Sequence, residues 1–297
     1  MSLLSDFDWS WRGVRVRETG AEIAFTSSLL WDVCRGGSYI LREALRRPGA
    51  ALPISVRYEP RAPRPWYLLW GTLRQAGLRR RDGKPKLTIQ FSDQTFTDAV
   101  ITDHETINGA CTDISKSHVA QVYESVFGYN LSIDPSQATG RYLEKGEENG
   151  IHDGQIHESP MQAKAGRVYQ KLIDNRTEDG TVLDYRCPTV FGDIPLIFLK
   201  ERPIDQRFAN LNTRVRIADP TDCFTSEERA QIKAFCVAMH LDWGGLDILR
   251  DGSDGRIYIV DVNKTDMGPP LALPMKEKLS AVKILGQALR DALVKRS

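Results

Sequence analysis

The clearest pattern of hydrophobic and polar positions lies near the carboxyl end of the chain, where two short apolar runs flank a polar turn. The runs cover residues 246–249 and 257–262, and the pair Asp254-Gly255 lies between them. Glycine adopts positive φ without a steric penalty, and Asp-Gly between two β-rich runs is a strong turn signal. The pattern therefore predicts a β-hairpin.

Carboxylate and amide side chains lie inside these apolar runs. Side chains alternate between the two faces of a strand, so we expect Asp261 and Asn263 on one face and Asp247 opposite them on the partner strand. A charge within an apolar strand is costly unless it is paired or bound to a metal. Two carboxylates and an amide oxygen suit Mg²⁺, so the hairpin predicts a magnesium site. Asp251 and Asp254, by contrast, are expected to be polar residues that flank a turn on a solvated face.

The remaining elements follow from periodicity and from helix caps and turn residues. Ser115 caps a helix with Val119, Val122 and Val126 on one face, and Thr225 begins another helix through a capping box with Glu228. The run 66–75 fits a strand or a helix equally well. We expect helices at 38–47, 115–127, from 225 and at 276–294, and strands at 22–25, 53–58, 129–133, 141–145, 166–175, 182–190 and 195–203.

The hairpin resembles the carboxyl-terminal part of the ATP-grasp superfamily. Members of that family carry an acidic residue on one strand and, after a hairpin, an acid-x-Asn on the next, and these residues hold the magnesium ions that bridge ATP. Asp247, Asp261 and Asn263 match this pattern, and residues 264–270 follow as a loop of the kind that closes over the acceptor. The family more often has Glu where this chain has Asp261.

The resemblance covers about residues 112–270 and implies further ATP contacts. An early lysine and a second lysine before a glycine-rich loop contact the phosphates, and the strand between the two ATP-clasping lobes contacts the adenine and the ribose. Loop amides near Gly146 and Gly150 could approach phosphate, with His152 as a loop residue within reach of it. The expected ATP-binding residues are Lys116, Lys145, Gly146, Gly150, His152, Gln170, Lys171 and Leu172, with Asp174 or Asn175 at the ribose.

Two strands after this segment carry Arg186, Lys200 and Arg202. Arginine suits fork-like contacts to phosphate or carboxylate, so these three residues are the expected catalytic cations. The resemblance implies transfer of the ATP γ-phosphate to a substrate carboxylate, followed by attack of an amine or another nucleophile on the acyl phosphate. Two alternatives stay open: a kinase of the same fold that phosphorylates a hydroxyl, and a nucleotide- or RNA-binding module.

Composition argues against several classes of protein but does not indicate a function. The chain has 297 residues, 41% of them hydrophobic, and a formal net charge of +1. Residues 74–86 carry six basic side chains, yet without a recognisable nucleic-acid module they are expected to form a solvated loop. The five cysteines form no C-x-x-C pair, which argues against a disulfide framework or a structural zinc site.

The expected architecture is an α+β ATP-grasp fold with two α/β lobes clasping ATP, preceded by a small N-terminal α/β domain. Its parts are residues 1–110 as the N-terminal domain, 111–168 as the central lobe and 169–297 as the lobe with the magnesium site. The expected cofactors are ATP and Mg²⁺, and the expected partners are a small-molecule carboxylate and a nucleophile. No signal peptide or membrane span is seen, so a cytoplasmic protein is expected. Nucleic acid is not expected as a partner. A homodimer is left open.

Overall fold

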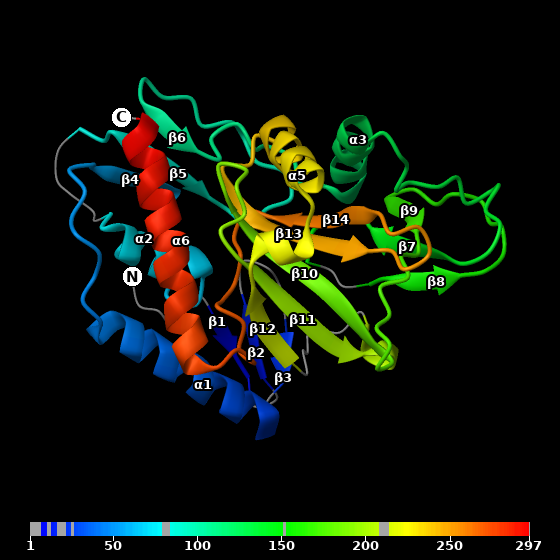
Figure 1. Ribbon diagram of the computed structural model, residues 1–297, viewed down its shortest axis with the longest axis horizontal. Coiled ribbons are helices and arrows are strands. Elements are labelled where there is room, and N and C mark those ends of the chain that lie inside the picture. The colour runs from blue at the N-terminus through cyan, green and yellow to red at the C-terminus, as the bar shows by residue number, and fades with distance from the viewer. Residues whose placement is uncertain are drawn as a thin grey trace. The chain divides into compact units, whose positions relative to one another are not determined.

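The computed structural model describes residues 7–10, 13–16, 22–24, 27–78, 84–150, 153–207 and 214–296. The chain divides into two compact units, residues 1–47 and 48–297. Its elements are shown in Figure 1. The α+β class predicted from the sequence is confirmed by the mixture of helices with parallel and antiparallel sheets.

The first unit contains a three-stranded antiparallel sheet and one long helix. The strands are β1 (Phe7–Trp9), β2 (Gly13–Val16) and β3 (Glu22–Ala24), and the helix is α1 (Ser27–Leu45). The helix predicted at 38–47 thus begins eleven residues earlier. It continues through Gly36-Gly37, although each glycine disfavours a helix interior by about 1 kcal/mol.

The second unit begins with a parallel sheet of β4 (Val56–Pro60), β5 (Leu87–Phe91) and β6 (Glu105–Ile107). The run that fitted a strand or a helix forms α2 (Leu68–Ala76), which packs against the last helix, α6 (Met275–Arg296). A Cβ atom at Gly286 would lie 2.5 Å from the Cβ of Gln75, so only glycine allows this close approach. The sequence had not predicted β5 or β6.

A three-stranded antiparallel sheet in the order β8-β7-β9 follows α3 (Lys116–Phe127). Its strands are β7 (Tyr142–Gly146), β8 (Gln155–His157) and β9 (Arg167–Lys171). The predicted strand at 129–133 is wrong, because that segment forms only an isolated bridge at Ser132. The Glu124 carboxylate accepts the amide hydrogens of Leu131 and Ser132 at 3.0 and 2.6 Å, which removes these donors from a strand ladder.

The largest sheet has five antiparallel strands in the order β12-β11-β10-β13-β14. The strands are β10 (Thr181–Val190), β11 (Ile197–Pro203), β12 (Arg214–Ala218), β13 (Trp243–Arg250) and β14 (Ile257–Asn263). A short 3-10 helix, η2 (Ile204–Gln206), follows β11, and α4 (Pro220–Cys223) precedes α5 (Ser226–Ala238). The predicted hairpin is confirmed as β13 and β14, which pair in antiparallel register.

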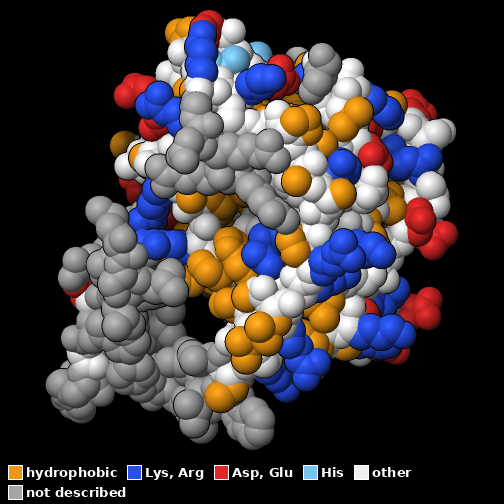
Figure 2. Space-filling view, turned by 90° about the vertical axis from the view of Figure 1, so that its left-hand side faces the viewer, with side chains coloured by type: hydrophobic (Ala, Val, Ile, Leu, Met, Phe, Trp, Pro, Cys, Tyr) orange, Lys and Arg blue, Asp and Glu red, His pale blue; other side chains and the backbone are white. Residues whose placement is uncertain are grey.

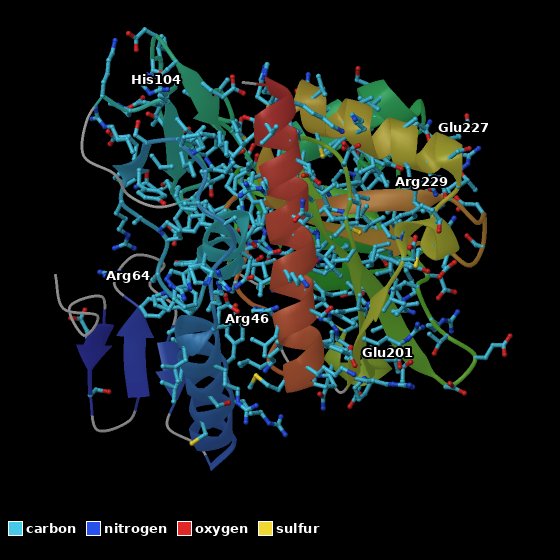
Figure 3. The ribbon with its side chains drawn as sticks, turned by 60° about the vertical axis from the view of Figure 1, so that its left-hand side comes forward. Arg46, Arg64, His104, Glu201, Glu227 and Arg229 are labelled. Atoms are coloured by element: carbon cyan, nitrogen blue, oxygen red, sulfur yellow. The ribbon has the colours of Figure 1, made fainter. Side chains whose placement is uncertain are left out.

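Helices α3 and α5 share one hydrophobic core with this sheet and lie over β13 and β14 in Figure 1. Both predicted caps are present: Ser115 Oγ accepts the amide of His118, and Thr225 forms the capping box with Glu228. In α5, Ile232, Phe235 and Cys236 are buried. Figure 3 shows Glu227 and Arg229 near the start of α5; Glu227 is exposed, whereas Arg229 is half-buried and donates to the carbonyl oxygen of Phe224 at 2.7 Å.

The surface shows no gathering of basic side chains on the face drawn in Figure 2: among the residues coloured there, Lys and Arg are spread between apolar and uncharged side chains. Part of the basic loop, residues 79–83, lies outside the described residues. No described helix combines the length and the hydrophobicity that a membrane span needs.

Candidate active site

One cavity of about 200 Å³ lies within the second unit, and most of the predicted site residues line it. Its walls come from the start of α3, from β7 and β9, and from the five-stranded sheet. The lining residues are Lys116, Leu143, Lys145, Gly150, Asp153, Gly154, Gln170, Lys171, Leu172, Ile173, Asn175, Asp184, Lys200, Arg202, Arg207, Asp247, Leu249, Val260 and Asp261.

The hairpin brings Asp247 and Asp261 into direct cross-strand register, as the sequence predicted. The register shifts between Asp247 and Ile248, so Asp261 pairs with Asp247 while Ile259 pairs with Ile248. Val260 is the extra residue of this bulge. A bulge redirects side chains locally, and here both Val260 and Asp261 line the cavity.

The carboxylate of Asp247 has the charge and the available oxygen atom that a ligand of a cation needs. Its Oδ2 atom lies 2.9 Å from Nη1 of Arg186, whereas Oδ1 is buried and has no hydrogen-bond partner among the described residues. Burial raises the pKa of Asp247, but the charges of Arg186, Lys200 and Arg202 outweigh this effect and hold the pKa below its ordinary value. An ionised carboxylate with one unsatisfied oxygen fits a divalent cation shared with Asp261.

Asn263 is placed differently from the two aspartates. Its Oδ1 atom accepts the amide hydrogen of Thr265 at 2.9 Å, and the residue is not part of the cavity lining. Within the described residues there is no group of three or more His, Cys, Asp and Glu side chains suited to a metal. The donors that fit Mg²⁺ here are therefore two carboxylates, and water would have to complete the coordination.

Two lysines face the carboxylates. Nζ of Lys116 lies 3.4 Å from Oδ1 of Asp261 and 3.3 Å from the carbonyl oxygen of Glu148, and its side chain is buried although it starts a helix. Nζ of Lys145 donates to the carbonyl oxygen of Val260 at 3.3 Å. Burial lowers the pKa of Lys145 to about 8; Asp261 opposes the shift and Lys116 adds to it.

The glycine-rich loop after β7 gives several of its amides to the protein itself. The amide of Gly146 donates to Oδ1 of Asp153 at 2.8 Å, and the amide of Asn149 donates to Oγ1 of Thr95 at 3.0 Å. Gly150 lines the cavity with a positive φ of 81°. His152 lies outside the described residues.

The segment expected to contact adenine ends β9. Gln170 is 1% exposed and lines the cavity, and neither polar atom of its side chain has a hydrogen-bond partner among the described residues. Leu172 also lines the cavity. Of the two ribose candidates, Asn175 lines the cavity, whereas Asp174 is paired with Arg176 at 2.6 Å and is not in the lining.

Lys171 lines the cavity but binds the turn of the hairpin with its ammonium group. Nζ lies 2.8 Å from Oδ2 of Asp251 and 2.8 Å from Oδ2 of Asp254, and 2.9 Å from the hydroxyl of Tyr258. The prediction that Asp251 lies on a solvated face is wrong: it is 1% exposed. It can be buried because Lys171 neutralises its charge and Ser253 donates two hydrogen bonds to Oδ1.

The three predicted catalytic cations divide into two groups. Lys200 and Arg202 line the cavity, and Arg202 forms an ion pair with Asp184. Arg186 is not in the lining; it is buried and bridges Asp247 to Asp266, with Nη2 of Arg186 2.6 Å from Oδ1 of Asp266. Arg186 therefore contacts the site through Asp247.

Sequence reasoning missed three polar residues of the cavity, namely Asp153, Asp184 and Arg207. Asp184 carried a usable signal, since it lies two residues before Arg186 in a strand and hence on the same face. Arg207 carried none. It reaches the cavity by donating to the carbonyl oxygen of Ile173 at 2.9 Å and to Oδ1 of Asn175 at 3.1 Å.

No protein-family model matches the chain, and no curated protein matches it. Solved structures do. The ATP-grasp ligase PsnB complexed with its minimal precursor is 15% identical, over 70% of this chain and 79% of that chain, with a TM-score of 0.49. In a second PsnB complex, with a phosphomimetic precursor variant, Mg and ADP, the chain spans only 62% of that chain, at 14% identity and a TM-score of 0.42.

A RimK domain ATP-grasp protein from Sphaerobacter thermophilus is 12% identical, over 71% of this chain and 82% of that chain, with a TM-score of 0.42. These solved structures are described as ATP-grasp proteins.

Proposed function

We propose that this chain is an ATP-grasp ligase that uses ATP and Mg²⁺ to activate a substrate carboxylate as an acyl phosphate, which an amine or another nucleophile then attacks. The observation that carries the proposal is the set of side chains that line this cavity. It combines two cross-strand carboxylates, Asp247 and Asp261, with cationic side chains and a buried, unpartnered amide. Such a set suits a nucleotide triphosphate with its metal.

At the phosphate end, Asp247 and Asp261 would hold Mg²⁺, and that ion would supply positive charge to neutralise the phosphates. Lys116 and Lys145 supply positive charge from α3 and β7, and Lys200 and Arg202 supply it from β11. Phosphoryl transfer needs little covalent chemistry from the protein, because fixed charges and an in-line arrangement of donor and acceptor lower the barrier. Arg186 acts as a positioning residue that fixes Asp247.

At the other end, Gln170 would donate to and accept from the base, and Leu172, Leu249 and Val260 would supply apolar surface. Asn175, which lines the cavity, is the candidate for the ribose. The cavity of about 200 Å³ is smaller than the roughly 300–1,000 Å³ of typical ligand pockets.

The test is to trap the acyl phosphate. With ATP, Mg²⁺ and a panel of amino acids, peptides and other carboxylates, excess hydroxylamine in place of the natural amine should yield a hydroxamate. The carboxylate takes the γ-phosphoryl group and ADP leaves; hydroxylamine then displaces phosphate from the acyl carbon. Hydroxamate, ADP and phosphate are expected in equal amounts.

Asp261→Asn should abolish hydroxamate formation, because it removes one charge from the metal site and keeps the side-chain volume. Asp222→Asn removes one charge from α4, outside the cavity, and should behave as the unmodified chain does. A stable phosphorylated product without hydroxamate or released phosphate would assign the chain to the kinases instead. Full activity in Asp261→Asn would show that Asp261 binds no metal.

A further inference from the structure

The loop between β7 and β8 is unusually acidic for a loop expected to bind phosphate. Its residues include Glu147, Glu148 and Asp153. Loops that bind anions present backbone amides and avoid nearby carboxylates, because like charges repel at short range. Of these three residues only Asp153 lines the cavity, and its carboxylate binds Gly146 and Arg167, which are not in the lining.

Asp153 is held there from two sides. Its Oδ1 atom accepts the amide hydrogen of Gly146 at 2.8 Å, and Oδ2 forms an ion pair with Nη1 of Arg167. Arg167 is itself fixed, since its Nε donates to Oε1 of Glu144 at 2.7 Å and Glu144 is only 3% exposed. These contacts fix the position of the Asp153 carboxylate.

A carboxylate oxygen that accepts from a loop amide has the same bonding as a phosphate oxygen in an anion-binding loop. Gly146 is not itself in the cavity lining, but it follows Lys145 directly, so its amide lies at the end of the strand that delivers this lysine to the cavity. As long as Asp153 accepts this hydrogen bond, the Gly146 amide cannot donate to a phosphate oxygen. The negative charge of Asp153, which Arg167 partly offsets, also acts on Lys145 in the cavity.

We propose that Asp153 limits the affinity of this cavity for nucleotides, because its carboxylate takes the Gly146 amide and places a negative charge where a phosphate group binds. The inference rests on the proposed function, in which the cavity holds the phosphates of ATP. It adds a residue that opposes binding to a set of residues that favour it. Removal of the carboxylate should therefore strengthen binding of phosphates.

The experiment measures binding to the full chain by calorimetry, with Mg²⁺ATP, inorganic triphosphate and adenosine as separate probes. Asp153→Ala frees the Gly146 amide for another acceptor and removes the carboxylate charge. It should therefore lower the Kd for ATP and for triphosphate by about five- to tenfold. Asp153→Asn removes the charge but keeps an acceptor for Gly146, so a smaller gain is expected. Adenosine carries no phosphate, and its affinity should stay unchanged.

Glu147→Gln is the matched control. It removes one negative charge from the same loop, but Glu147 binds Ser117 at the start of α3 and does not line the cavity. An equal gain in Glu147→Gln and Asp153→Ala would overturn the inference, because the effect would then come from net charge alone. Unchanged or weaker binding of ATP and triphosphate in both Asp153 variants, with thermal unfolding as in the unmodified chain, would also overturn it.

Failure of the proposed function gives a different result. If the unmodified chain and both Asp153 variants bind triphosphate with the expected order of affinities but bind no ATP, the phosphate subsite stands and the nucleotide role falls. If ATP binds with the same affinity in every variant, the nucleotide role stands and the role of Asp153 falls.

Discussion

At the scale of single residues, the charge of Lys145 depends on its burial. The residue is half-buried, and desolvation lowers the pKa of its ammonium group from the ordinary 10.5 to about 8. Near pH 8 about half of the molecules therefore carry a neutral Lys145 before any ligand binds. Phosphate groups favour the charged form of a neighbouring lysine, so nucleotide binding should raise this pKa again.

We predict that ATP binding takes up a proton near pH 8, to an extent of up to about half a proton per site. The uptake should disappear near pH 6, where Lys145 is already charged, and affinity should fall as the pH rises above 8. Calorimetry in two buffers with different ionisation enthalpies measures the uptake. Lys145→Met cannot bind the proton, so persistence of the same uptake in this variant would assign it to another group.

At the scale of elements, the end of β9 is fastened to the turn between β13 and β14. Lys171 binds both Asp251 and Asp254, and Tyr258 donates to Asp254 at 2.8 Å. Burial lowers the pKa of Lys171, but its bonds to Asp251, Asp254 and Tyr258 outweigh burial and raise it. Lys171 thereby joins β9, which carries the candidate adenine contacts, to the hairpin that carries Asp247 and Asp261.

We predict that Asp251→Ala lowers the free energy of unfolding by about 2–3 kcal/mol, since it leaves the Lys171 ammonium and the Ser253 donors with fewer acceptors at a buried position. Urea denaturation followed by circular dichroism measures the loss. Asp254→Ala is the comparison, because Asp254 also binds Lys171 but has 30% of its side chain exposed. An equal loss in both variants would contradict the importance of burial at Asp251.

At the scale of the whole molecule, every residue of the cavity belongs to the second compact unit, residues 48–297. The first unit has its own sheet and helix. The division predicted from the sequence, with boundaries after residues 110 and 168, remains a prediction. So do the cytoplasmic location, the absence of nucleic-acid partners and the homodimer left open.

We predict that residues 48–297, produced without the first unit, fold cooperatively and bind Mg²⁺ATP with a Kd within about twofold of that of the full chain, since compact units with their own core fold independently. Thermal unfolding and calorimetry check the two parts of this prediction. A truncated chain that melts without a cooperative transition, or that binds ATP far more weakly, would show that residues 1–47 are needed for the site.

The sequence by itself determined the features that depend on neighbours in the chain. The hairpin of β13 and β14 follows from strand periodicity and from an Asp-Gly turn. The regular register would pair Asp247 with Val260, and the bulge at Val260 brings Asp261 opposite Asp247 instead. The caps Ser115 and Thr225 are equally local, because each satisfies amides within three residues. The segment 129–133 was mispredicted because the Glu124 side chain competes for its amides.

Only the tertiary structure decided how residues far apart in the chain share charges and donors. Arg186 meets Asp266 across 80 positions and so lies behind Asp247 instead of in the cavity. Lys171 meets Asp254 across 83 positions, and Arg207 meets Asn175 across 32. A side chain's partner is set by which segments pack together, because ionic and hydrogen-bond energies depend on distance and burial. The pattern along the chain gives the type of each side chain, and the packed fold gives its partner.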